Sequence, residues 1–197
     1  MAFSVVADLA DVGRGWRDRD EVLEAPATDG QRSIDDGVAA ELAADLRRHE
    51  LDAQARLPLT DGIPGLTIAD AYAIQRAYLA DRLASGARLV GRKVGATNPV
   101  IQALFSVDQP DYGVLLDDMV LADGARIATR RLIAPRVEPE IGFILGEALE
   151  GPGVTPVQVL LATRGLVPCF EIIDSRIVDW RIGLVDTIAD KIGRAHV

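Results

Sequence analysis

The chain has 197 residues, the length of one domain or at most two; 49% of them are hydrophobic and 26% are charged. This composition is typical of a globular protein and excludes a disordered or collagen-like chain. The 21 basic and 30 acidic residues give a formal net charge of −9, so neither nucleic acid nor an anionic membrane is expected as a partner. One Cys and two His cannot form a Cys₄ or Cys₂His₂ zinc site, so a metal would need oxygen ligands.

The first part of the chain predicts helices. Residues 1–33 show no sustained hydrophobic period and are predicted to form a mobile leader with at most a short helical turn. Apolar residues then recur at four-residue spacing and predict a helix over residues 34–51. After a break that contains Pro and Gly, Thr67 and Asp70 form the pattern of a capping box. This pattern predicts a second helix that ends near Gly86.

The chain after Gly86 predicts strands instead. Short apolar runs separated by turn residues are expected to form four strands, with a helix between the last two. The predicted strands cover residues 88–94, 119–127, 137–145 and 166–173, and the predicted helix covers 156–164. Helices followed by strands indicate an α+β fold, with N-terminal helices and a mixed, mainly β core, rather than an alternating parallel sheet.

The sequence contains no apolar run of the roughly 18 residues that a membrane-spanning helix requires. Its N-terminal stretch includes two Asp residues and no basic residue before Arg14, which is unlike a secretory signal. We therefore expect a cytoplasmic protein without a membrane partner, in which the single Cys169 stays reduced.

Residues 136–143, RVEPEIGF, carry two candidate functional carboxylates. Side chains alternate between the faces of a strand, so Glu138 and Glu140 are predicted to point to the same side. A solvated strand face is the ordinary explanation for such a pair, but the apolar sequence around it indicates burial. Two buried carboxylates repel each other unless a cation lies between them. Pro139 has no N–H group and therefore predicts a strand edge or a bulge.

A third carboxylate, Glu171, lies in the apolar segment PCFEIIDS, where an unpaired charge would be costly. A bound divalent cation would keep this group ionised. Three carboxylates and water form a natural octahedral site for Mg²⁺ or Mn²⁺, with positions left for a substrate. An ion pair with an arginine such as Arg176 would also satisfy Glu171, and the residues alone leave both alternatives open.

Two further segments carry polar residues in positions suited to a site. In GRKVGATN, residues 91–98, Lys93 lies between two glycines at a strand end, where the backbone can approach a ligand closely. The glycine spacing does not match a P-loop, and an ordinary surface lysine is the alternative. In VDQPDYG, residues 107–113, a predicted loop presents Asp108 and Asp111, although these residues are also good turn formers.

Taken together and in this order, five segments resemble the 2-keto-4-pentenoate hydratase family (2-hydroxypenta-2,4-dienoate hydratases) of the fumarylacetoacetate hydrolase superfamily. The segments are GRKVGATN, VDQPDYG, APRVEPEIGF, FEIIDSRIVDW and DTIAD, and the resemblance covers residues 34–190. Glu-Pro-Glu stands where members of the family commonly have Glu-Ala-Glu, but the carboxylate positions are retained. The resemblance implies a fumarylacetoacetate-hydrolase-like core.

The resemblance also implies roles for the candidate residues. It makes Glu138, Glu140 and Glu171 the ligands of Mg²⁺ or Mn²⁺. It makes Lys93 an active-site cation and Asp111 an acid/base group in a loop over the substrate. The implied reaction is hydration of 2-hydroxypenta-2,4-dienoate to 4-hydroxy-2-oxopentanoate in the catabolism of aromatic compounds. The expected partners are a small 2-oxo or 2-hydroxy dienoic acid, other copies of the chain in a homo-oligomer, and a sister decarboxylase.

Three other functions compete with hydration. Decarboxylation of 2-oxo-3-hexenedioate (4-oxalocrotonate) uses a similar metal site and fold, although VDQPDYG is more similar to the hydratases. Hydrolysis of a carbon–carbon bond in an acylpyruvate would need a water-activating pair centred on histidine, whereas His49 lies on a predicted scaffold helix. The third alternative belongs to a different class: the chain would be an inactive fragment or a non-catalytic subunit of an oligomer.

The C-terminal residues favour a fragment. IGRAHV, residues 192–197, is the translation of the start of a widely used sequencing adapter, and the family continues beyond the DTIAD segment. We therefore expect a leader over 1–33, a partial hydratase-like catalytic domain over 34–191, and read-through over 192–197. Missing strands would leave sheet edges and apolar surface exposed, so the chain is predicted to be poorly soluble or inactive.

Overall fold

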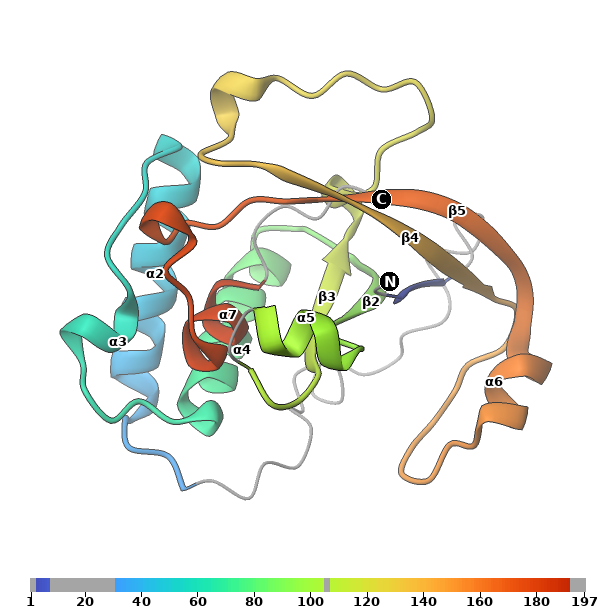
Figure 1. The fold of residues 1–197 in the computed structure, drawn as a ribbon, viewed down its shortest axis with the longest axis horizontal. Helices are drawn as coiled ribbons and strands as arrows, with labels where there is room; N and C mark the ends of the chain where they lie inside the picture. Colours follow the sequence, from blue (N-terminus) through green and yellow to red (C-terminus); the bar gives the residue numbers. More distant parts are fainter. Residues whose placement is uncertain (1–2, 8–30, 105–106, 192–197) are drawn as a thin grey trace.

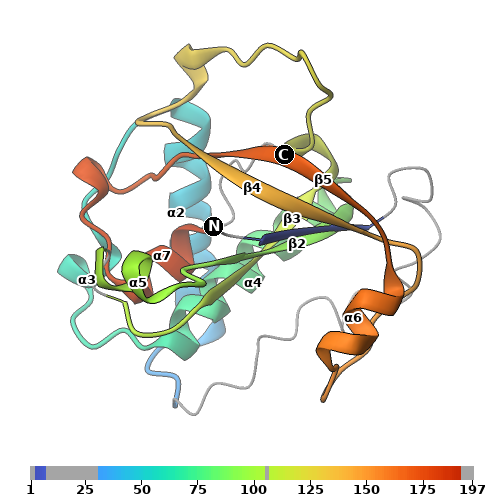
Figure 2. The same ribbon diagram turned by 45° about the vertical axis from the view of Figure 1, so that its right-hand side comes forward.

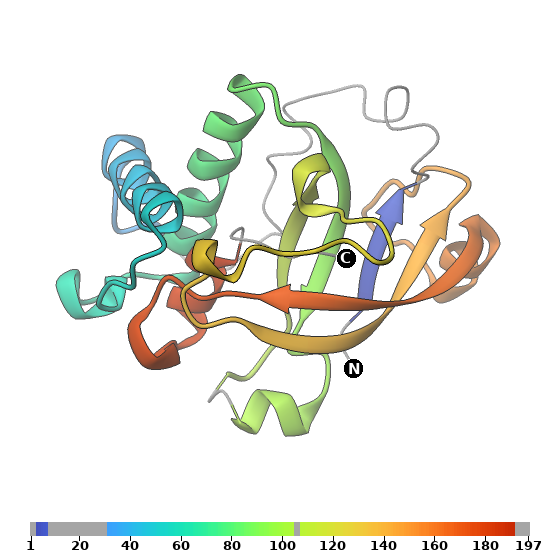
Figure 3. The same ribbon diagram turned by 90° about the horizontal axis from the view of Figure 1, so that it is seen from above.

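Two long helices lie on one side of a five-stranded sheet. The computed structural model describes residues 3–7, 31–104 and 107–191. Helices α2 (Asp36–Asp52) and α4 (Ile68–Ala84) pack together beside the sheet (Figure 1), and Figure 3 shows both on the same side of it. The short helix α7 (Leu184–Asp190) packs against α4. This arrangement confirms the predicted α+β fold.

The starts of both long helices are fixed by local capping interactions. Helix α2 begins after Asp35, whose side chain accepts a 2.9 Å hydrogen bond from Val38 N. At α4 the predicted capping box is present: Thr67 Oγ1 accepts from Asp70 N at 3.2 Å, and Asp70 Oδ2 accepts from Thr67 N at 2.9 Å. Beyond α4 the chain turns at Gly86, whose φ of 98° suits a residue without a Cβ. Both predicted helices are confirmed.

The sheet has the strand order β3-β2-β1-β4-β5. All neighbouring pairs are antiparallel except β1 and β4, which run parallel. The strands are β1 (Phe3–Ala7), β2 (Leu89–Gly95), β3 (Asp111–Leu116), β4 (Arg136–Leu145) and β5 (Thr163–Ile173). The predicted strands over 88–94, 137–145 and 166–173 are therefore confirmed as β2, β4 and β5.

The prediction of a leader without strands over 1–33 is wrong for Phe3–Ala7. These five residues form β1, which pairs with β2 on one side and β4 on the other. A strand of this length is stabilised by its two neighbours, an interaction that a local hydrophobic period does not reveal. Residues 1–2 and 8–30 of the predicted leader lie outside the described residues, as do residues 192–197.

The region between β2 and β4 also differs from the prediction. Residues 111–116 form β3 rather than a loop, and the predicted strand over 119–127 is wrong. A short 3₁₀ helix ends β3, and Gly124, with a φ of 76°, then turns the chain. The predicted helix after β4 is confirmed as α6 (Pro156–Ala162). The remaining elements are α3 (Leu59–Gly62), α5 (Pro99–Leu104), and the 3₁₀ helices η1 (Asp117–Met119), η2 (Thr129–Arg131) and η3 (Val178–Trp180).

The hydrophobic core lies between the long helices, α7 and the strands β2 and β3. Leu46 of α2, Ile74 of α4, Leu116 of β3 and Ile188 of α7 are all fully or almost fully buried in it. His49 lies on α2, as predicted, and its Nδ1 is 3.0 Å from the carbonyl oxygen of Gln54. Within the part of the chain that the structure describes, no helix has both the length and the apolar character needed to cross a bilayer.

Strands β4 and β5 form a long ribbon that carries α6 at the end distant from α2 and α4 (Figure 2). Large apolar side chains are exposed on these three elements: Val137, Val157, Leu160, Leu161, Leu166 and Phe170. We call this set the ribbon apolar surface. Pro139 lies in β4 opposite Phe170, and the described pairing of β4 with β1 begins only at Ile141. Among the described residues, Pro139 therefore has no partner in β1, which agrees with the expected edge position.

Candidate metal centre

The antiparallel pairing of β4 with β5 brings the three predicted glutamates together. Glu138 is directly opposite Glu171, and Glu140 is opposite Cys169, one position further along the same face. One carboxylate oxygen from each of Glu138, Glu140 and Glu171 lies within 4.8 Å of the others. Glu140 and Glu171 are buried and Glu138 is half-buried. The predicted common orientation of Glu138 and Glu140 is confirmed.

The pKa values of Glu138 and Glu171, whose carboxyl groups face each other, shift in opposite directions. Burial, with the negative charge of Glu171 as the next cause, raises the pKa of Glu138. Burial acts in the same direction on Glu171, but the nearby ammonium of Lys93 outweighs it and lowers the pKa of Glu171. The cluster therefore concentrates negative charge, and Lys93 pairs directly with Glu171.

Lys93 is a buried site residue rather than a surface lysine. It lies on β2, only 4% of its surface is exposed, and its Nζ is 2.7 Å from Glu171 Oε1. The alternative pairing of Glu171 with Arg176 is wrong. Arg176 instead pairs with Asp190, with 2.6 Å between Nε and Oδ1, and both side chains are buried. The cation beside the glutamates thus comes from β2.

Asp111 is the first residue of β3, and it is buried rather than presented by an open loop. It pairs with Gly95 of β2, and its Oδ2 is 2.9 Å from Lys191 Nζ. A Cβ at Gly95 would lie 2.7 Å from Asp111 Oδ1 and 2.3 Å from Lys191 Nζ, so a side chain there would displace this ion pair, which glycine leaves in place. Asp111 and Lys93 are therefore held on adjacent strands.

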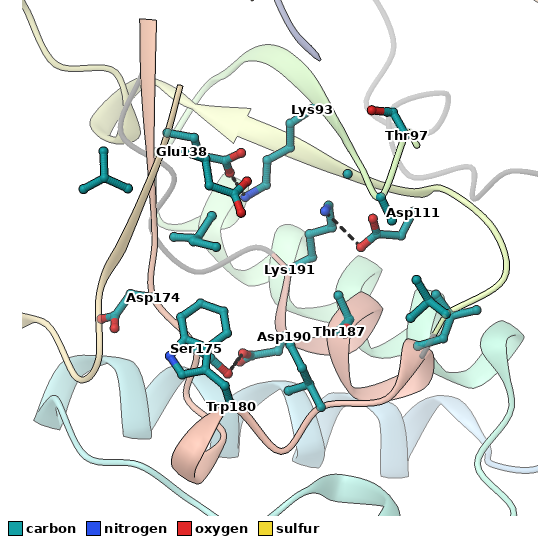
Figure 4. Close-up of a pocket in the computed structure, with 18 of the residues that line it drawn as sticks. Lys93, Thr97, Asp111, Glu138, Asp174, Ser175, Trp180, Thr187, Asp190 and Lys191 are labelled. Atoms are coloured by element: carbon teal, nitrogen blue, oxygen red, sulfur yellow. Dashed lines mark hydrogen bonds and ion pairs between the residues drawn. The ribbon is translucent and has the colours of Figure 1, made fainter. Parts of the chain in front are cut away.

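A cavity of about 300 Å³ connects these groups. Lys93, Glu138 and Glu171 line it, and so does Asp111. A second set of residues lines the other end of the cavity. Figure 4 shows Asp174, Ser175, Trp180 and Asp190 in the lower part of the view, away from Glu138. The structure thus brings Lys93, Asp111 and the three glutamates into one region, whereas Asp108 is not among the residues that line the cavity.

The residues of this second group had no predicted role, although their segments were recognised. Asp174, Ser175 and Trp180 belong to FEIIDSRIVDW, and Asp190 belongs to DTIAD. Ser175 Oγ donates a 2.8 Å hydrogen bond to Asp190 Oδ2, which joins the two segments. Asp174 accepts hydrogen bonds from Ile133 N and Ala134 N, at 2.8 and 2.7 Å. Their position in short motifs was the only available signal, since their contacts are between distant parts of the chain.

The donor set fits a hard divalent cation. Carboxylate oxygens are the ligands that Mg²⁺, Mn²⁺ and Ca²⁺ prefer, and three of them converge within 4.8 Å. The raised pKa of Glu138 has the same physical origin, because burial beside another carboxylate disfavours its charged form. A bound cation would remove that penalty.

Known proteins with similar sequences are hydratases of small dienoates. The chain is 46% identical over 153 residues to a 2-hydroxyhexa-2,4-dienoate hydratase of Comamonas testosteroni, a match that covers 73% of this chain and 58% of the relative. It is 43% identical over 159 residues to a 2-hydroxypent-2,4-dienoate hydratase of Pseudomonas putida, which covers 80% of this chain and 72% of the relative. No family model matches the chain.

A similar solved structure is that of 4-oxalocrotonate decarboxylase from Pseudomonas putida G7, complexed with magnesium and adipate. Its TM-score is 0.79 at 30% identity, over 84% of this chain and 64% of that one. The fold and the carboxylate cluster thus define a protein of the fumarylacetoacetate hydrolase type. On its sequence, the chain belongs to the 2-keto-4-pentenoate hydratase family. It spans 58% of the Comamonas relative and 64% of the decarboxylase.

Proposed function

We propose that this chain carries the active site of a hydro-lyase that adds water to 2-hydroxypenta-2,4-dienoate and yields 4-hydroxy-2-oxopentanoate, in the catabolism of aromatic compounds. The observation that carries the proposal is the convergence of Glu138, Glu140 and Glu171 in one cluster, with Lys93 beside it. The hydratase names of relatives at 43–46% identity support the same reaction.

In this proposal the three glutamates hold Mg²⁺ or Mn²⁺. The solved structures of 4-oxalocrotonate decarboxylase are complexed with magnesium in one case and calcium in another, which supports binding of a divalent ion by this chain. When bound, such an ion supplies Lewis-acid polarisation of the substrate's 2-oxo group and a template for its carboxylate.

Lys93 and Asp111 are the proposed proton-handling groups. Lys93 Nζ is held by Glu171, so its remaining N–H groups are placed beside the glutamate cluster, where they can donate to a substrate oxygen. Asp111 lies on the neighbouring strand and lines the same cavity, where its carboxylate can accept a proton from water or from the substrate. The strand pairing keeps the two groups in a fixed relation while the substrate reacts.

Ultraviolet-followed turnover tests this function. We expect loss of 2-hydroxypenta-2,4-dienoate absorbance only when Mg²⁺ or Mn²⁺ is present, and abolition of turnover by a chelator. Full turnover after exhaustive chelation would contradict the metal assignment. No turnover of any 2-hydroxydienoate under metal saturation would contradict the hydratase assignment.

Decarboxylation of 2-oxo-3-hexenedioate is the second candidate, because a similar solved structure is that of a decarboxylase. Parallel assays with the dienoate and with the hexenedioate separate the two reactions. A higher kcat/KM for the dienoate supports hydration, and the reverse order supports decarboxylation.

The cellular location, the oligomeric state and the partner of the chain are also proposals. We infer a cytoplasmic enzyme that assembles as a homo-oligomer and associates with a sister decarboxylase. An inactive or non-catalytic subunit is the alternative from another class. Size-exclusion chromatography with light scattering measures the oligomer, and co-elution with the decarboxylase tests the complex.

A further inference from the structure

Trp180 forms part of the cavity wall at the end distant from Glu138 and Lys93 in the view of Figure 4. Two contacts fix its indole ring. Its Nε1 donates a 3.0 Å hydrogen bond to the carbonyl oxygen of Ala134, and the guanidinium carbon of Arg136 lies 4.2 Å from the ring centroid. Because these contacts hold both the edge and the face of the ring, the indole is a rigid part of the cavity.

The backbone at this position is also unusual. Asp179 and Trp180 have φ values of 55° and 56°, in the left-handed region that residues with a Cβ seldom adopt. The turn is closed by hydrogen bonds from Arg181 N to Val178 O at 3.1 Å and from Ile182 N to Trp180 O at 2.8 Å. Such conformations persist where the surrounding structure requires a side chain in a particular place, and they cluster at ligand sites.

The chemistry around Trp180 suits an uncharged ligand group. Ile182 and Leu184, which follow Trp180 in the chain, also line the cavity. The acidic groups that line this end already have partners, because Asp190 pairs with Arg176 and Asp174 accepts from Ile133 N and Ala134 N. A substrate carboxylate left without a partner among these apolar side chains would be costly to bury.

The positive charges of the cavity are already paired. Among the described residues that line it, the basic side chains are Lys93 and Lys191, whose partners are Glu171 and Asp111. Arg136 stacks on the Trp180 ring but is not among the residues that line the cavity. A second carboxylate at the far end of a substrate would therefore find no unpaired cation in the lining, whereas a hydrocarbon tail would contact the indole.

We propose that Trp180 is a specificity-determining residue that contacts the uncharged distal end of the dienoate chain and limits its length. This inference rests on the proposed function, in which the carboxylate and 2-oxo end of the substrate lies at the glutamate cluster. It goes further by assigning the opposite end of the substrate to the Trp180 wall and by excluding a distal carboxylate there.

Substitution of Trp180 tests the length limit. The ratio of kcat/KM for 2-hydroxyhexa-2,4-dienoate to that for 2-hydroxypenta-2,4-dienoate is measured in wild type, Trp180→Ala and Trp180→Phe. We expect the ratio to rise about 10-fold in Trp180→Ala, since one methylene in an apolar pocket changes selectivity by about this factor or more. A smaller rise is expected in Trp180→Phe. Leu51→Ala, at an exposed leucine of α2, is the control and should leave the ratio unchanged.

A ratio that stays unchanged in both Trp180 variants, while circular dichroism shows native folding, would overturn the inference and leave the hydratase function intact. The inference would also be overturned if the wild-type enzyme turned over 2-oxo-3-hexenedioate as efficiently as the pentadienoate. Trp180→Phe retains an aromatic ring, so it keeps the test valid if Trp180→Ala does not fold.

A binding measurement is independent of turnover. The chain has two tryptophans, so in Trp16→Phe the fluorescence reports on Trp180 alone. With Mg²⁺ present, we expect saturable quenching by 2-oxopentanoate and at least about 10-fold weaker binding of 2-oxoglutarate, which adds a distal carboxylate. Equal binding of the two acids, or no quenching by 2-oxopentanoate, would overturn the inference. Quenching by 2-oxopentanoate without turnover of any dienoate would support the tail subsite while the proposed reaction failed.

Discussion

The ammonium group of Lys93 and the carboxylate of Glu171 lie 2.7 Å apart, with both side chains buried. Sequence reasoning predicted each residue as a site residue but not their contact. The two residues are 78 positions apart in the chain, and two other strands lie between β2 and β5 in the sheet. The glutamate set was predictable, since strand alternation and an apolar setting are local properties. The position of Trp180 was not, because it depends on a left-handed turn and on a contact with Arg136 of β4.

Replacement of Lys93 by methionine should lower turnover. The change keeps the length of the side chain but removes the cation that pairs with Glu171 of the glutamate cluster. We expect kcat at saturating metal to fall by about 10²-fold or more, the usual range for a lost proton-transfer group. Arg88→Met, at an exposed residue just before β2, is the matched control and should have normal turnover. Unchanged turnover in Lys93→Met would remove this residue from the mechanism.

Replacement of Glu138 by glutamine should weaken metal binding. The variant retains the shape of the side chain but removes one of three carboxylates in the cluster. We expect the Kd for Mn²⁺, measured by calorimetric titration, to rise by at least about 10-fold, since even neighbours of metal ligands affect affinity to this extent. Glu147→Gln, an exposed site just after β4, controls for net charge. Equal affinity in wild type and Glu138→Gln would exclude Glu138 as a ligand.

At the scale of elements, helices and strands with local sequence signals could be predicted, whereas those that depend on long-range contacts could not. Helices α2 and α4 were predicted with their starts because Asp35 and the Thr67–Asp70 box act within a few residues. Strand β1 was missed because its five residues gain their order from β2 and β4, and β3 was mistaken for a loop because VDQPDYG ends in a strand. The strand predicted over 119–127 failed for a related reason, since an apolar run without a pairing partner does not form a strand.

The capping box of α4 should make stability depend on acid pH through Asp70. Burial opposes ionisation of this carboxyl, but hydrogen bonds from Ser33 and Thr67 outweigh it and hold the pKa of Asp70 well below its ordinary value. The carboxylate therefore stabilises the fold fully above the unfolded-state pKa of about 4, and this stability is lost as the pH falls towards the folded-state pKa.

Asp70→Asn should accordingly destabilise the chain at neutral pH by about 1 kcal/mol, the usual cost of a lost helix cap. The difference from wild type, measured by urea unfolding, should shrink as the pH is lowered below about 4. Asp81→Asn, at an exposed position of the same helix, is the control and should have little effect. A difference that is constant from pH 7 to pH 3 would contradict the role assigned to the ionised carboxyl.

At the scale of the whole molecule, the structure has two unlike sides. The helices α2, α4 and α7 cover one side and enclose the core, whereas the ribbon of β4 and β5 extends beyond it with α6 (Figure 1). The ribbon apolar surface lies on these last three elements, and Leu161 alone is 79% exposed. Exposed apolar side chains promote association, and the poor solubility of the chain stays a prediction that these three elements would explain.

Polar substitution on α6 should improve solubility. The double variant Leu160→Ser/Leu161→Ser removes two exposed leucines of the ribbon apolar surface without changing β4 or β5. We expect lower light scattering at equal protein concentration and a higher soluble yield. Val100→Ser, at an exposed apolar residue of α5 outside this surface, is the control and should not change the scattering. Identical scattering of the double variant and wild type would contradict the assignment.

Pro139 lies between the proposed ligands Glu138 and Glu140, and it has a consequence for the backbone around them. A polypeptide laid along β4 needs a continuous series of N–H and C=O groups, and the series lacks its N–H at residue 139. An intruding peptide would therefore be bound least well beside the carboxylates themselves. We therefore expect Pro139 to disfavour pairing of another chain's backbone beside Glu138 and Glu140, the proposed ligands.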